Sequence, residues 1–66
     1  MKVVLYSTKC PKCNILKTKL ERKNIQFEEE NNVEVMIGKG FTETPMLEVD
    51  GEIMNFSQAN NWINNK

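Results

Sequence analysis

The sequence predicts a small α/β protein with a four-stranded mixed sheet and three helices, in the order β-α-β-α-β-β-α. Short apolar runs alternate with segments of helical periodicity, and the first three segments follow a strand–helix–strand pattern. A turn sequence nearer the C-terminus predicts a hairpin. A strand–helix–strand unit makes two strands parallel and a hairpin makes two antiparallel, so the sheet is expected to be mixed.

The first three elements are expected in the first half of the chain. Residues 3–6 form a β-branched, nearly all-apolar run, which favours a central strand covered on both faces. Residues 11–23 have an apolar stripe with helical spacing, a proline at the first position and basic residues in the last turn, which predicts a helix. Residues 25–28 alternate between apolar and polar, as in a half-buried strand.

A short helix is expected next, with Asn31 or Asn32 as a weak N-cap signal. Val33, Met36 and Ile37 have the spacing of one helical face, which we expect to be its apolar side.

The last elements are a hairpin and a helix. Residues 46–49 and 52–54 are expected to be antiparallel strands, because Asp50-Gly51 between them suits a two-residue type I′ turn. Ser57 is expected to cap a final helix that has its own apolar stripe.

Length and composition limit the class of protein. The 66 residues are expected to form one domain, 1–66. No stretch approaches the ~18 apolar residues of a membrane span, and the start is too short for a signal peptide, so we expect a cytoplasmic protein with no membrane partner. We also expect a monomer. The zero net charge argues against a nucleic-acid partner. The chain has no histidine, and therefore lacks the usual general base and the commonest metal ligand.

The zero net charge hides an uneven distribution. Residues 1–23 contain seven basic side chains against Glu21 alone, whereas residues 24–66 contain two basic and eight acidic side chains. Two interpretations stay open at this point. In the first, both halves are solvated and their charges are screened over ~8 Å. In the second, the positive charge of residues 1–23 acts on the two cysteines that lie in that half.

Those cysteines form the motif that predicts chemistry, Cys10-Pro11-Lys12-Cys13, between a predicted strand and a predicted helix. If Pro11 is the first helical residue, Cys10 is the N-cap and faces the positive end of the helix dipole. Lys9 and Lys12 add positive charge. A thiol with a pKa of about 8.5 is only a few per cent ionised at pH 7, and lowering that pKa to about 7 makes half of it thiolate.

This arrangement favours thiol–disulfide exchange. Cys10 is expected to be the catalytic nucleophile, with Pro11, Lys9 and Lys12 as supporting residues, and Cys13, one turn inside the helix, to be the resolving thiol. A structural disulfide is a weaker interpretation, because the ring is short. A metal-binding or non-catalytic interaction module is the alternative; we expect no metal site, because two thiolates fall short of the about four ligands of structural zinc.

A second feature is Thr44-Pro45, just before the third predicted strand. Together with Cys-Pro-Lys-Cys after the first strand, the Asp-Gly hairpin and the closing helix, it makes the chain resemble a glutaredoxin of the thioredoxin superfamily over essentially its whole length. The resemblance implies a thioredoxin-like fold and a cis Thr44–Pro45 bond beside the dithiol. It also implies that Thr44, Pro45 and Tyr6 form the substrate-binding surface.

By the same resemblance, the chain is an electron-carrying enzyme of cell redox homeostasis that binds no cofactor. The resemblance implies that its electrons come from glutathione or from a thioredoxin-reductase-type enzyme, and that its substrates are disulfide-containing proteins or glutathione mixed disulfides. The short length also resembles that of the small glutaredoxin-like redoxins, which implies ribonucleotide reductase as one of these substrates. Lys12 stands where the family usually has tyrosine, Ser7 where it has a glutathione-binding lysine, and Met54-Asn55 where it has two glycines. We therefore expect a weak response to glutathione and keep both donors open.

Overall fold

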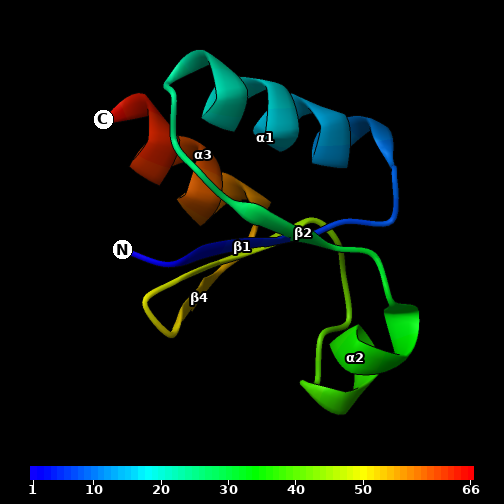
Figure 1. The fold of residues 1–66 in the computed structure, drawn as a ribbon. Helices are drawn as coiled ribbons and strands as arrows, with labels where there is room; N and C mark the ends of the chain where they lie inside the picture. Colours follow the sequence, from blue (N-terminus) through cyan, green and yellow to red (C-terminus); the bar gives the residue numbers. More distant parts are fainter.

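A computed structural model describes residues 1–66 and contains four strands and three helices, in the predicted order (Figure 1). The elements are β1 (Val3–Tyr6), α1 (Pro11–Arg22), β2 (Glu28–Glu30), α2 (Val33–Gly38), β3 (Met46–Val49), β4 (Glu52–Met54) and α3 (Phe56–Asn64). None of the helices is long and apolar enough to cross a membrane.

The four strands form one mixed sheet, in the order β2-β1-β3-β4. β1 runs parallel to β2 and antiparallel to β3, and β3 runs antiparallel to β4. Leu5 lies opposite Glu29 on one side and opposite Leu47 on the other. The expectation of a mixed sheet with a central first strand is therefore confirmed.

The main core lies between one face of this sheet and the helices α1 and α3, which lie side by side in Figure 1. Side chains alternate along β1, so Val3 and Leu5 point into this core while Tyr6 points to the other face. Leu16 and Leu20, one turn apart on α1, are fully buried. Burying such a side chain stabilises the fold by about 2 kcal/mol before entropy is counted. The core cluster comprises Val3, Leu5, Leu16, Leu20, Leu47, Val49, Met54, Ala59 and Ile63.

The second strand lies later than the alternation in residues 25–28 predicts, since β2 spans Glu28–Glu30. Ile25 and Phe27 are partly buried and pack against the core from the connection between α1 and β2. Their alternation therefore reports burial, not strand pairing. β2 itself is an edge strand of three glutamates, and charge on an edge strand opposes unwanted pairing with other chains.

The last helix begins two residues earlier than predicted, because Asn55, not Ser57, is its N-cap. The Asn55 side chain accepts a hydrogen bond from the Gln58 backbone N–H at 2.9 Å, and the Gln58 side chain accepts one from the Asn55 N–H at 3.0 Å. This reciprocal capping box needs a glutamine or glutamate three residues after the cap. Asn55 has Gln58 at that position, whereas Ser57 has Asn60.

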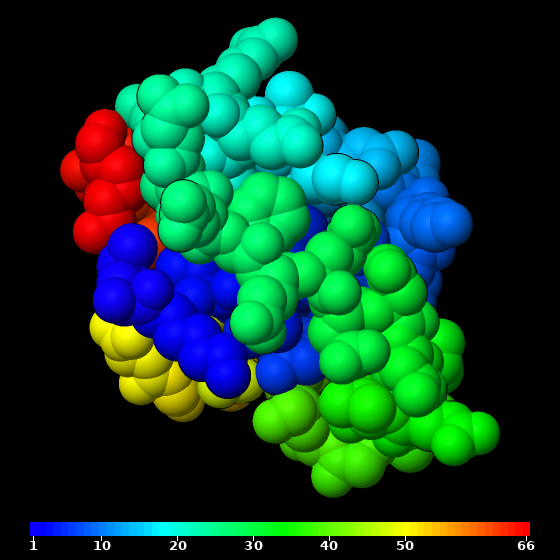
Figure 2. Space-filling model, in the orientation of Figure 1, coloured from blue at the N-terminus to red at the C-terminus, as the bar shows by residue number.

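The short helix α2 projects from one end of the molecule (Figure 2, green). Asn32 is its N-cap, and its side chain accepts from the Glu34 N–H at 2.9 Å. The predicted apolar face is wrong for two of its three residues: Met36 is buried, but Val33 is 52% and Ile37 67% exposed. A six-residue helix at the end of the sheet covers too little surface to bury a whole stripe.

The predicted hairpin is confirmed in both its strands and its turn. Asp50 and Gly51 have φ values of 50° and 88°, and a type I′ turn requires positive φ at both positions. The Asp50 carboxylate also accepts a hydrogen bond from the Lys2 N–H at 2.8 Å, which ties the turn to the start of β1.

Candidate functional site

The candidate site begins with the loop that joins β1 to α1, and Ser7 anchors this loop. Ser7 is 2% exposed, and its backbone N–H donates to the Glu30 carbonyl at 3.0 Å. Its own carbonyl accepts from the Asn31 side-chain amide at 3.0 Å, and its hydroxyl accepts from the Lys9 N–H at 3.2 Å. The end of β2 and the residues after it therefore hold the loop in place. The Asn31 side chain donates to the Ser7 carbonyl, and the N-cap of α2 is Asn32.

The two cysteines are joined by a disulfide at the start of α1, with their Cα atoms 5.0 Å apart. As the sequence predicts, Cys10 is the N-cap and Pro11 the first helical residue. The Cys13 N–H donates to Cys10 Sγ at 3.2 Å. Cys13 is fully buried, whereas Cys10 is partly exposed. The pair therefore joins a partly exposed residue at the N-cap to a fully buried residue in the first turn of the helix.

The surroundings of Cys10 are basic and aromatic. Lys9 and Lys12 are both exposed, and the first turn of α1 contains no acidic residue. The Lys12 ammonium lies 5.5 Å from the ring centroid of Phe56, at the start of α3, within the range of a cation–π contact. The charge of Lys12 therefore lies between the beginnings of two helices.

The turn before β3 meets the loop that leads to Cys10. In the antiparallel pair of β1 and β3, Tyr6 lies opposite Met46, so the residues after Tyr6 and before Met46 share one end of the sheet. The hydroxyls of Thr8 and Thr44 lie 3.0 Å apart across this junction. The Thr44–Pro45 bond is cis, as the resemblance implies, and Pro45 is buried.

Tyr6 occupies a different environment. Its side chain is 4% exposed and lies on the sheet face opposite the α1–α3 layer, where its hydroxyl donates to Glu48 at 2.7 Å. Its ring packs edge-on against Phe41 with the centroids 4.9 Å apart. Burial, with the hydrogen bond and negative charge of Glu48, raises the pKa of Tyr6 to about 12. The hydroxyl hydrogen of Tyr6 is therefore taken up by Glu48, and its ring packs against Phe41.

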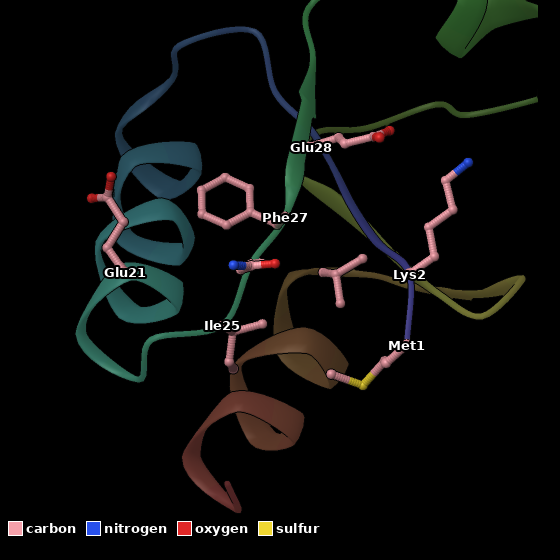
Figure 3. Close-up of a pocket in the computed structure, with 8 residues that line it drawn as sticks. Met1, Lys2, Glu21, Ile25, Phe27 and Glu28 are labelled. Carbon is pink, nitrogen blue, oxygen red and sulfur yellow. The ribbon is translucent and has the colours of Figure 1, made fainter.

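A pocket lies at the other end of the molecule (Figure 3). It has a volume of about 700 Å³, and Figure 3 shows Met1 and Lys2 on one side and Ile25 and Phe27 on another. Glu21, in the last turns of α1, also lines it, whereas Cys10 is at the first turn, and a 12-residue helix is about 18 Å long. The pocket is therefore separate from the disulfide.

Sequence reasoning found the two cysteines but missed Thr8 and Phe56 as neighbours of the motif. No local pattern indicates either contact, because each joins segments that are far apart in the sequence. No three cysteine or carboxylate side chains gather as a group that could hold a metal ion. The redox-capable group of the site is the Cys10–Cys13 disulfide, and Cys10 is the more exposed of its two residues. Comparison with known proteins adds no relative, since no family model, curated protein or solved structure matches the chain.

Proposed function

We propose that the chain is a thiol–disulfide oxidoreductase in which Cys10 is the nucleophile and Cys13 the resolving cysteine. One observation carries the proposal: Cys10 and Cys13 lie about one helical turn apart with their sulfurs bonded, Cys10 partly exposed and Cys13 fully buried. The Cys13 N–H aimed at Cys10 Sγ favours the charged form of that sulfur in the reduced protein. Lys9 and Lys12 act in the same direction.

The reaction then follows as two exchanges. The Cys10 thiolate attacks one sulfur of a substrate disulfide, the substrate S–S bond breaks, and the first substrate thiolate leaves and takes up a proton. The Cys13 thiol loses its proton and attacks Cys10 Sγ, which releases the second substrate thiolate. The protein dithiol loses two electrons and becomes the disulfide, and the substrate gains them. The nearness of Cys13 makes this second step effectively intramolecular.

We also propose that the fold is thioredoxin-like and of the glutaredoxin type. The element order, the mixed sheet with strand order β2-β1-β3-β4, and Thr44-Pro45 beside the loop before Cys10 support this. Thr44 and Pro45 would then contact the substrate, and Tyr6, the third residue expected on this surface, lies opposite Met46 at the same end of the sheet. Disulfide-containing proteins, ribonucleotide reductase among them, are the proposed substrates of a cytoplasmic monomer.

The electron donor is proposed to be a thioredoxin-reductase-type enzyme or glutathione, with glutathione the weaker. At the start of α3, the side chains of Asn55 and Gln58 form the capping box, so Asn55 already accepts from a backbone N–H group. A carboxylate of glutathione would compete with that side chain. Starting from the oxidised protein, we therefore expect reduction by thioredoxin reductase and NADPH to be faster than reduction by glutathione and its reductase.

The proposal is tested with two single variants in a coupled disulfide-reductase assay. Cys10→Ser should lose activity, because it removes the attacking sulfur. Cys13→Ser should accumulate a mixed disulfide between Cys10 and the substrate, visible by non-reducing gel and mass spectrometry, because the resolving thiol is missing. Activity retained by Cys10→Ser would show that the nucleophile is wrongly assigned.

A further inference from the structure

Lys9 has a backbone conformation that a lysine rarely adopts. Its φ is 64°, in the left-handed region, which costs an L-residue about 1 kcal/mol. The other non-glycine residues at positive φ are Asn24 and Asp50, the types that tolerate this region best. Glycine would occupy the position of Lys9 with less strain. Such strain beside a reactive group points to a use for the side chain.

Neither Lys9 nor Lys12 has an acidic partner in the fold. The ion pairs of the structure are Lys17–Glu29 at 3.3 Å and Lys39–Glu48 at 3.9 Å, and neither includes Lys9 or Lys12. Lys12 is exposed and rests over the ring of Phe56. The two lysines therefore present unpaired positive charge on either side of Cys10 along the chain.

Most of the acidic side chains are in other parts of the fold. Three of them form the edge strand Glu28–Glu30, and Asp50 and Glu52 lie in the β3–β4 hairpin. Glu43, in the turn that leads to Thr44, is the acidic residue nearest in sequence to the proposed substrate surface. Within residues 7–13, which contain both cysteines, the charged side chains are Lys9 and Lys12 alone, so this segment complements an acidic partner.

We propose that this surface selects protein disulfides whose cysteine has acidic neighbours, and that Lys9 and Lys12 recognise those neighbours. The proposal rests on the proposed oxidoreductase function and adds the class of substrate. The occupant is an extended segment of a substrate protein, with its sulfur at Cys10 and its carboxylates beside the two ammonium groups. In a single turnover one substrate disulfide becomes two thiols and the Cys10–Cys13 dithiol becomes the disulfide, and the proposed electron donor then returns the disulfide to the dithiol.

The test uses reduced protein, freed of reductant, and three disulfide-linked peptides that differ only beside the cysteine, with glutamate, glutamine or lysine. The measured quantity is the ratio of the single-turnover rate constants for the glutamate and lysine peptides. We expect a ratio of about ten at low ionic strength, and a loss of about threefold in each of Lys9→Gln and Lys12→Gln, within the range of an exposed charge pair. In 1 M NaCl the ratio should approach one, because the Debye length falls to about 3 Å.

Two controls separate local recognition from general effects. Arg22→Gln removes one charge from the far end of α1 and should keep the wild-type ratio. Lys9→Gly should lose the preference as Lys9→Gln does, while its Tm rises by roughly 4 °C because strain is relieved.

The outcomes for this proposal and for the proposed function are distinct. Equal rates for the three peptides, or the same loss of preference in Arg22→Gln as in Lys12→Gln, would overturn the substrate preference and leave the oxidoreductase function intact. Failure to reduce any of the peptides, the glutamine one included, would overturn both.

Discussion

Tyr6 is the chain's one tyrosine, so its ionisation can be followed without interference from another phenol. Its hydroxyl donates to Glu48 in a buried position, and ionisation would place two negative charges side by side away from water. The neutral phenol is therefore favoured in the folded protein.

We predict that the tyrosinate absorbance of the native protein rises with a midpoint near pH 12, not near the ordinary value of 10. Glu48→Gln should move the midpoint down toward 10, because the negative charge is gone. A native midpoint near 10 would show that the phenol is not buried against Glu48.

The raised pKa of Tyr6 also makes the free energy of unfolding depend on pH. The native state holds the Tyr6 proton more tightly than the unfolded state, so this contribution is fully present below pH 10 and is lost as the pH rises toward 12. We expect a loss of about 2 kcal/mol in the free energy of unfolding over this range, which Tyr6→Phe should lack.

At the scale of the elements, the N-cap of α3 can be tested by substitution, because the sequence predicts Ser57 and the structure shows Asn55. Asn55→Ala should lower the free energy of unfolding by about 1 kcal/mol, because it breaks the capping box. Ser57→Ala is the matched control and should change it by less than about 0.5 kcal/mol. Urea unfolding of the oxidised protein measures both. A larger loss in Ser57→Ala would favour the cap that the sequence predicts.

Local sequence signals predicted β1, the start of α1 and the hairpin correctly, and they misplaced β2. The apolar run of β1, the proline that begins α1 and the Asp50-Gly51 turn each depend on neighbouring residues, and their predictions are confirmed. Ile25 and Phe27 alternate because they cover the core, so the strand predicted from them is misplaced. Their pattern shows burial but cannot show which residues pair with β1.

At the scale of the whole molecule, the site depends on how the strands are ordered. Because β1 ends where β3 begins, the segment with Cys10 and the turn with Thr44 share one end of the sheet. The motif Cys10–Cys13 could be found from the sequence, and the hairpin too. The pairing of β1 with β3, which brings Thr8 to Thr44, involves segments some forty residues apart and leaves no local signal.

The most direct test of the proposed function is an equilibrium redox titration of the Cys10–Cys13 pair, followed by thiol alkylation and mass spectrometry. We predict a reversible two-electron couple between about −270 and −180 mV, the range from thioredoxin to protein disulfide isomerase. Zinc binding to the reduced protein is measured in parallel. A pair that shows no reversible couple and instead binds stoichiometric zinc would contradict the oxidoreductase function and favour a metal-binding module.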